Sequence, residues 1–260
     1  MKKKILIMIY QEGASGLTYM NRCGGNYALR RMVKDGNAAA EAIVKAGGEA
    51  YICDVCAKGR DIIDNELTKK AKRVSLGEIP ALCKSGLNGV ALVGIHAMNN
   101  AEQAFGSYSV NETAWYEYTI NGKLSGDIAM AATYFGSKGI PIIAVTGDLA
   151  AVKECQDLVG NIPAGVVKKA KVRNVTYEAL DETEGEALVA SVCVEGMRNS
   201  DKIKPYVVPG PYCVQVKYNR ADYCDEALAY YMGDKSFQRI SALVAEKRKE
   251  TLELFNDLRI

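Results

Sequence analysis

Histidine is the residue type that this sequence most nearly lacks, because its 260 residues contain one, His96. A Ser-His-Asp or Cys-His catalytic arrangement would have to use His96 as its base, and a zinc site would have to draw its other ligands from carboxylates, thiolates or water. His96 follows the apolar run at residues 90–95, which predicts a buried strand. Open α/β sheets place ligand sites at the carboxyl ends of strands, so His96 is a candidate site residue. Its position leaves open the alternative of a hydrogen-bonded histidine that only closes a strand.

The sequence also lacks a charge excess and a long apolar run. Lys and Arg number 33 against 31 Asp and Glu, so the net charge of +2 gives no basic field of the kind that nucleic-acid binders carry. No apolar run approaches the roughly 20 residues that cross a bilayer, and residues 5–9 are too few for the core of a signal peptide. We therefore expect a cytoplasmic protein with no membrane partner and no nucleic-acid partner.

Nucleotide-binding signatures are absent too, since the glycine-bearing segment after the first predicted strand fits neither GxGxxG nor GxxxxGK[ST]. The eight cysteines are scattered through a large chain, which is typical of reduced cytosolic thiols and not of a disulfide scaffold. Cys53 and Cys56 form one CxxC motif, a candidate thiol redox pair. A zinc ribbon would need a second such pair, which the sequence does not contain.

Strand and helix patterns alternate along most of the chain. The predicted strands cover residues 4–10, 49–56, 90–95, 116–120, 141–148, 165–172 and 212–218, and the predicted helices cover 26–46, 65–72, 126–136, 151–159, 181–198 and 239–258. Asn121-Gly122 is a hairpin signal. This order predicts an α/β fold with a mostly parallel sheet flanked by helices and a smaller C-terminal α+β lobe. We expect the α/β domain to span residues 1–165 and the lobe 166–260.

Three apolar strands carry a polar side chain at or just beyond their carboxyl ends, and these are Glu12, His96 and Asp148. Parallel strands should bring the three to one edge of one sheet. Glu12, His96, Cys56 and Asp127 offer carboxylate, imidazole and thiolate ligands, which suit Zn²⁺. A bound metal ion would polarise a carbonyl and lower the pKa of a coordinated water.

Several different short motifs follow one another in a characteristic order along nearly the whole chain. They are Glu12-Gly13-Ala14-Ser15-Gly16-Leu17, the helix at 27–48, Cys53-Asp54-Val55-Cys56, Gly94-Ile95-His96-Ala97, Ser107-Tyr108-Ser109, Ile120-Asn121-Gly122-Lys123, Gly126-Asp127 and residues 141–148. In order and spacing they resemble the D-aminopeptidase family of zinc metallopeptidases. The resemblance implies a two-lobed α/β subunit in a ring-shaped homo-oligomer. It also implies a metal-dependent amide hydrolase, or metallopeptidase, that acts on short peptides or amino-acid amides.

The resemblance further implies a two-zinc centre, with ligand positions that fall on Tyr10, Glu12, Cys56, His96 and Asp127. Glu12 and His96 keep the family's residue types, Asp127 is shorter than the family's glutamate, and Cys56 replaces a histidine. Tyr10 stands where the family has an aspartate able to bridge two ions, so we expect one zinc ion and not two.

A histidine thought to act in catalysis in the family falls at Tyr108. Tyr108 could donate a hydrogen bond to an oxyanion, but its ordinary pKa of about 10 makes it a poor general base. These changes leave a second hypothesis open, a catalytically silent homologue that keeps the fold and the oligomer for ligand binding or assembly. A thiol redox protein that uses Cys53 and Cys56 is the third.

Overall fold

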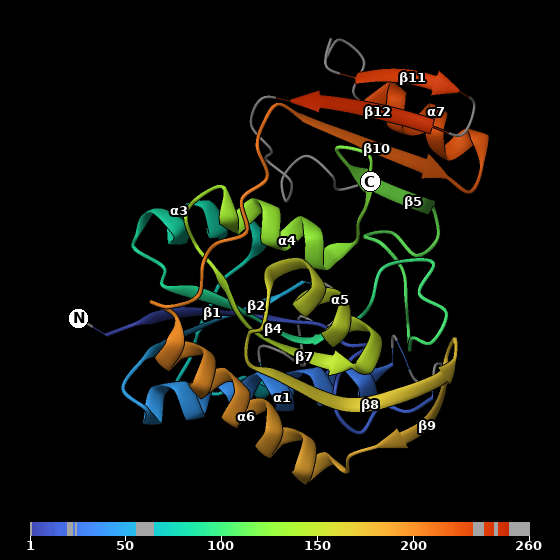
Figure 1. Ribbon diagram of the computed structural model, residues 1–260. Coiled ribbons are helices and arrows are strands. Elements are labelled where there is room, and N and C mark those ends of the chain that lie inside the picture. The colour runs from blue at the N-terminus through green and yellow to red at the C-terminus, as the bar shows by residue number, and fades with distance from the viewer. Residues whose placement is uncertain are drawn as a thin grey trace.

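The protein, in the computed structural model, is built from two β-sheets and the helices packed on them (Figure 1). The structure describes residues 2–19, 23, 25–55, 65–230, 237–241 and 244–249. The larger sheet has the strand order β3-β2-β1-β4-β7-β8-β9 and the smaller one the order β11-β12-β10-β5-β6. These described elements confirm the predicted α/β class.

The strands of the larger sheet are β1 (Lys4–Ile9), β2 (Glu49–Asp54), β3 (Lys72–Arg73), β4 (Gly89–Ile95), β7 (Ile142–Asp148), β8 (Ala164–Val172) and β9 (Val175–Ala179). All neighbours from β3 to β8 pair in parallel, and β9 pairs antiparallel with β8. The smaller sheet contains β5 (Trp115–Ile120), β6 (Lys123–Leu124), β10 (Tyr212–Tyr218), β11 (Phe237–Ser241) and β12 (Val244–Lys249).

Helices cover both faces of the larger sheet. The helices that the structure describes are α1 (Asn26–Lys45), the 3-10 helix η2 (Leu76–Glu78), α3 (Ile79–Lys84), α4 (Asp127–Gly136), α5 (Leu149–Val159), α6 (Glu182–Asn199) and α7 (Ala221–Tyr230). In Figure 1, α1 and α6 lie together on one face, whereas α3, α4 and α5 lie on the other. Helix α7 packs on the smaller sheet.

Strand β1 shows why its apolar run is continuous. Ile5, Ile7 and Ile9 face the core formed with α1 and α6, whereas Leu6 and Met8 face the core on the opposite side. A strand covered on both faces needs apolar side chains at odd and even positions alike. The core that holds Leu6 and Met8 continues into the smaller sheet, which joins the two sheets through buried side chains.

The two sheets do not divide the chain at one point. Strands β8 and β9 lie in the larger sheet, and the smaller sheet combines β5 and β6 with β10, β11 and β12. The Asn121-Gly122 hairpin prediction is confirmed, because both residues have positive φ and join β5 to β6. The division at residue 165 into separate units stays a prediction.

Two helix predictions are wrong. Residues 237–241 and 244–249 form β11 and β12, and β12 pairs antiparallel with β10. The helix expected at 239–258 therefore does not form over these residues. Residues 250–260 lie outside the described part of the chain. The helix expected at 65–72 extends no further than residue 66, and residues 72–73 form β3. In both segments a hydrogen-bonding partner distant in sequence decides the structure, which helical spacing of apolar residues cannot reveal.

Candidate functional site

The candidate site lies where the order of the parallel strands reverses. The chain runs from β1 outward through β2 and β3, then returns to place β4 on the other side of β1. The loops after β1 and β4 therefore lead away in opposite directions, and the crevice between them is where open α/β sheets bind ligands. Glu12 follows β1 and His96 follows β4, so both predicted side chains lie at this crevice.

Three glycines allow the backbone segments around these two loops to approach each other closely. A Cβ on Gly13 would lie 2.4 Å from Ile95 O, and one on Gly94 would lie 2.5 Å from Tyr10 O. Gly147 of β7 is equally close to Ile95 O, at 2.3 Å for a Cβ. The pairing of β4 with β7 shifts its register between Leu92 and Ile95, and it ends with Ile95 opposite Gly147, just before His96.

The His96 side chain is buried between two tyrosine rings. Its ring stacks on that of Tyr108 with centroids 3.8 Å apart, and the Tyr10 ring meets it edge-on at 6.0 Å. The Nδ1 atom donates a hydrogen bond to Ala97 O at 3.1 Å, which leaves the proton of a neutral ring on Nδ1. The Nε2 atom is buried and has no hydrogen-bond partner among the described residues.

Electrostatics at His96 favour a positive charge. Desolvation by burial lowers the pKa of the imidazole, but the negative charges of Asp127, Glu12 and Glu154 and the hydrogen bond to Ala97 O together outweigh that effect, and the pKa is raised overall. A site that stabilises a proton on a buried ring would also stabilise a cation in its place.

Glu12 is 5% exposed and only partly satisfied. Its Oε1 accepts a hydrogen bond from Gln11 Nε2 at 3.4 Å, whereas its Oε2 is buried without a partner among the described residues. Lys168 fixes the backbone of this loop, because its Nζ donates to Glu12 O at 2.7 Å and to Leu17 O at 2.6 Å. Lys168 is itself 2% exposed, and burial lowers its pKa to about 8.

The two other carboxylates predicted at this edge have different surroundings. Asp127 begins α4, and its Oδ2 accepts a hydrogen bond from Val110 N at 2.8 Å on the loop that follows Tyr108. Asp148 is fully buried and caps α5, since its oxygens accept from Ala151 N and Phe105 N at 3.0 and 2.9 Å. Asp148 is therefore a structural residue that holds the Tyr108 loop.

Glu154 of α5 was not predicted from the sequence, although it lies close to this site. Its Oε2 accepts a hydrogen bond from Met98 N at 2.7 Å, and its Oε1 is buried without a partner among the described residues. Desolvation raises its pKa to about 7, and the charge of His96 opposes that rise. No local pattern distinguishes Glu154 from the solvated glutamates of other helices, because its position depends on how α5 packs.

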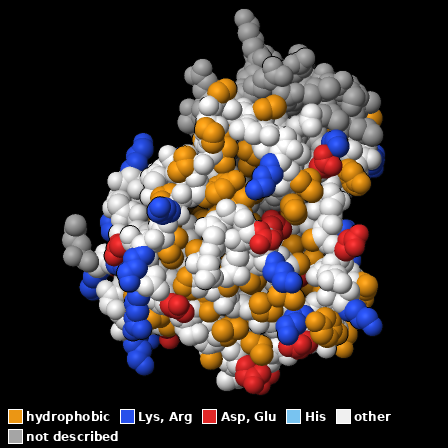
Figure 2. Space-filling model, viewed as in Figure 1, with side chains coloured by type: hydrophobic (Ala, Val, Ile, Leu, Met, Phe, Trp, Pro, Cys, Tyr) orange, Lys and Arg blue, Asp and Glu red, His pale blue; other side chains and the backbone are white. Residues whose placement is uncertain are grey.

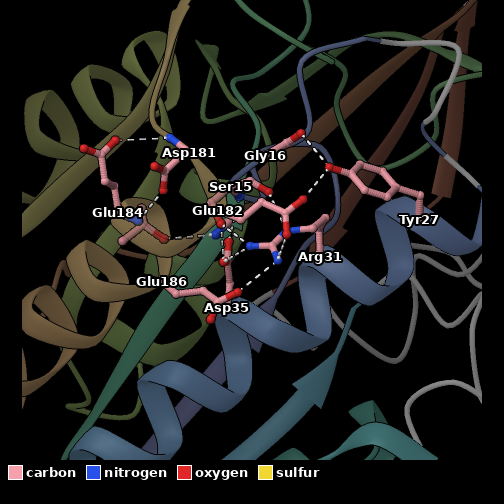
Figure 3. Close-up of polar contacts among 11 residues, drawn as sticks. Ser15, Gly16, Tyr27, Arg31, Asp35, Asp181, Glu182, Glu184 and Glu186 are labelled. Carbon is pink, nitrogen blue, oxygen red and sulfur yellow. Dashed lines mark hydrogen bonds and ion pairs between the residues drawn. The ribbon is translucent and has the colours of Figure 1, made fainter.

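A second unpredicted cluster supports the loop after β1 from below (Figure 3). Ser15 donates from its N and its Oγ to the two carboxylate oxygens of Asp35, at 2.8 and 2.5 Å. Arg31 donates to Ser15 O and Oγ at 3.0 and 2.8 Å, and its Nη1 contacts Glu182 and Glu186 of α6 at 2.9 Å. Arg31 and Asp35 are spaced i, i+4 among buried apolar residues of α1, and that spacing was the available signal.

A cavity of about 910 Å³ opens at this crevice. Glu12, Asp127, Tyr10 and Tyr108 line it, together with Trp115 and polar residues of the surrounding loops. Over the face shown in Figure 2, acidic and basic side chains are both scattered.

Glu12, His96 and Asp127 are the members of the predicted ligand set that the structure describes. They lie in one region but do not form a metal site by themselves. Among the residues that the structure describes, no three His, Cys, Asp or Glu side chains are grouped so that they could hold a metal ion. Cys56 lies outside the described residues, so the four-residue set stays a prediction. Glu12 Oε2 and His96 Nε2 do fit a cation, because both are buried lone-pair donors that lack a partner among those residues.

Cys53, the described half of the CxxC motif, is fully buried in the core beside the larger sheet. Redox-active cysteines are solvent-accessible. The burial of Cys53 therefore gives the redox hypothesis no support, and that hypothesis stays untested because Cys56 is not described.

None of the helices in the described part of the chain is long and apolar enough to cross a bilayer. A family model described as D-aminopeptidase matches residues 3–256. The D-aminopeptidase of Bacillus subtilis (strain 168) is 24% identical over 262 residues, which cover 97% of this chain and 94% of that protein. A solved structure, the Zn-dependent D-aminopeptidase DppA from Bacillus subtilis, described as a self-compartmentalizing protease, superposes with a TM-score of 0.83. It is 19% identical, and the match covers 99% of this chain and 95% of that one.

Proposed function

This chain belongs to the D-aminopeptidase family, and from that premise we propose that it is a divergent metal-dependent amide hydrolase that acts on short peptides or amino-acid amides. One observation carries the proposal. Glu12 Oε2 and His96 Nε2 are both buried and unpaired among the described residues, at the ends of the two strands between which the sheet order reverses. Two unpaired buried acceptors are costly unless a ligand satisfies them.

We propose that one zinc ion is that ligand, held by Glu12, His96 and Cys56, with a water in the position that the shorter Asp127 does not reach. The structurally similar DppA is Zn-dependent, which supports zinc. The Tyr10 ring meets the His96 ring edge-on and supplies no carboxylate to bridge a second ion. A bound zinc ion would polarise a substrate carbonyl and lower the pKa of water.

Side chains of this protein would orient the substrate, stabilise the oxyanion that forms during hydrolysis and favour a cation at the site. Tyr108 lines the cavity with its ring fixed against His96, so it is placed to donate a hydrogen bond to the oxyanion that forms from the substrate carbonyl. Asp127 and Glu12 make the region favourable for a cation, as the raised pKa of His96 indicates.

Metal analysis of the purified protein tests this proposal. We expect one zinc ion per chain, removal of hydrolysis by a chelator and its return when zinc is added. The variants Glu12→Gln and His96→Ala should lose the metal, whereas Glu112→Gln, which changes a carboxylate elsewhere on the cavity wall, should keep it. A wild-type protein that neither copurifies with a transition metal nor takes one up would exclude the hydrolase.

A catalytically silent homologue is the second candidate. Tyr10 and Tyr108 stand at two positions where the family has an aspartate and a histidine, and the described residues do not complete a three-ligand group. A protein that binds D-alanine amide or a short peptide with and without added zinc but releases no product would establish this alternative.

We also propose that the chain forms a cytoplasmic, ring-shaped homo-oligomer. The description of DppA as self-compartmentalizing supports an assembly that encloses its active sites. Sedimentation velocity and negative-stain electron microscopy test the proposal, and a monomer at micromolar concentration would contradict it.

A further inference from the structure

The cavity wall carries charges of both signs, and the sole cation among its described lining residues is Arg173. The acidic side chains on the same wall are Glu12, Glu112 and Asp127. Most other described lining residues are neutral and polar or aromatic, including several asparagines. A cavity with one guanidinium and several carboxylates fits a ligand that is itself zwitterionic.

Arg173 is held over the cavity by the residue that follows it. It lies in the tight turn between β8 and β9, where Asn174 adopts a φ of 63°. Asn174 N donates to Ala104 O at 2.9 Å, and its Oδ1 accepts from Gly106 N at 2.8 Å. The turn is thus attached to the loop that carries Tyr108, so Arg173 and Tyr108 are positioned together.

The charge of Arg173 is available to a ligand. Its side chain is exposed, and no ion pair joins it to another residue in the described part of the chain. Arg30, Arg31 and Arg220, by contrast, each pair with a carboxylate. An unpaired guanidinium on a cavity wall is well suited to a carboxylate, which it can bind through two parallel hydrogen bonds.

We propose that Arg173 binds the free C-terminal carboxylate of a short peptide, and so makes this cavity selective for peptides over their C-terminal amides. The inference rests on the proposed function, because it names the substrate class of the same site. The acidic side chains on the same wall would then attract the substrate's amino group. A volume of about 910 Å³ is ample for a ligand of two or three residues.

The test compares D-alanyl-D-alanine with D-alanyl-D-alaninamide, which differ in the terminal carboxylate. Both are titrated calorimetrically into the purified full-length protein, and their hydrolysis is followed in parallel. We expect the wild type to favour the acid by roughly tenfold or more, and Arg173→Gln to lose roughly ten- to a hundredfold in affinity for the acid. The same variant should bind the amide as the wild type does, and in hydrolysis the loss should appear in KM for the acid and not in kcat.

Two further variants isolate the guanidinium. Arg173→Lys keeps the charge without the planar fork and should restore part of the preference. Arg198→Gln removes an exposed arginine of α6 that does not line the cavity, and it should change nothing. Equal affinity of the wild type for acid and amide, or equal losses for both in Arg173→Gln, would overturn the proposal.

The binding and turnover measurements separate this inference from the proposed function. Arg173-dependent preference for the acid without turnover of either compound supports the carboxylate site and refutes the hydrolase. Turnover of both compounds with no dependence on Arg173 supports the hydrolase and refutes the carboxylate site.

Discussion

Arg30 and Arg31 are consecutive residues of α1 in opposite environments. The Arg31 side chain is 5% exposed and contacts Ser15, Asp35, Glu182 and Glu186. The Arg30 side chain is 58% exposed and pairs with Glu66 at 2.9 Å. Burial distinguishes the two, because removal of one member of a buried pair leaves the other charge without compensation.

We expect Arg31→Met to lower the free energy of unfolding by about 3–5 kcal/mol, because Asp35 would stay buried without its cation. Arg30→Met removes a surface pair and should cost about 0–1 kcal/mol. Urea unfolding of both variants measures the difference. Equal effects of the two substitutions would show that the buried cluster does not stabilise the fold.

Lys168 gives the protein a distinctive pH dependence. Its folded pKa is about 8 and its ordinary value is 10.5, so between these values the unfolded chain holds a proton that the folded chain has released. The free energy of unfolding should therefore rise with pH across this window, by up to about 1.4 kcal/mol per pH unit, and the contribution should be flat below pH 7.

The difference between wild type and Lys168→Met isolates this contribution, since thiols and tyrosines titrate in both. We expect the free energy of unfolding of the wild type to rise relative to that of the variant between about pH 7 and 9.5. Lys169→Met, which removes the neighbouring exposed lysine that pairs with Glu178, should show no such gain. A constant difference for Lys168→Met would mean that Lys168 stays protonated throughout.

At the residue scale, sequence patterns could place Glu12 and His96 of the candidate site just beyond two strand ends, because strand ends are visible as the ends of apolar runs. They could not predict Glu154, Lys168 or Arg31 as neighbours of that site. Each of these three contacts a segment distant in sequence, and only the packing of helices and strands brings the partners together.

At the scale of elements, the close contact between the loop after β1 and the end of β4 sets the geometry of the site. Gly13 and Gly94 approach opposing backbone atoms, which cannot move aside as a flexible side chain could. The separation of Glu12 from His96 therefore depends on two residues that carry no functional group.

We expect Gly13→Ala to destabilise the protein by about 2–4 kcal/mol and to lower metal affinity, because its Cβ would force the two loops apart. Gly77→Ala is the matched control, since its Cβ would meet nothing closer than Ser75 Oγ at 4.0 Å, and it should stay within about 0.5 kcal/mol of wild type. Thermal unfolding and zinc titration of both variants test this. Unchanged zinc affinity in a folded Gly13→Ala protein would contradict the positioning role.

Strands and helices could be predicted from the sequence where the local hydrophobic pattern matches the burial of the folded element. Strands β1, β4 and β7 are apolar on both faces, and a polar residue ends β7 or follows within two residues of the end of β1 and β4, so the sequence predicts each near its observed bounds. Strands β11 and β12 were mistaken for a helix, since their backbone pairing with β10 has no counterpart in the local sequence.

At the scale of the whole molecule, the two sheets share one hydrophobic core. Trp115 and Val214 of the smaller sheet belong to the same buried cluster as Leu6 and Met8 of β1. Two sheets that bury each other's apolar side chains should lose their structure together.

Trp115, the single tryptophan, makes this testable, because its fluorescence reports on the smaller sheet while far-ultraviolet circular dichroism reports on all helices and strands. We expect the two urea transitions to coincide, with the same midpoint and slope. A fluorescence transition at lower urea would show that the smaller sheet unfolds by itself.

The solitary, buried His96 also makes this protein unusually simple to observe by nuclear magnetic resonance. With one imidazole in the chain, a long-range ¹⁵N–¹H correlation spectrum contains one set of ring signals and needs no assignment. The Nε2 shift alone would distinguish a protonated ring, a neutral ring with its proton on Nδ1, and a ring bound to a metal ion. The protonation state and metal occupancy of the predicted ligand His96 would thus be read directly at one atom.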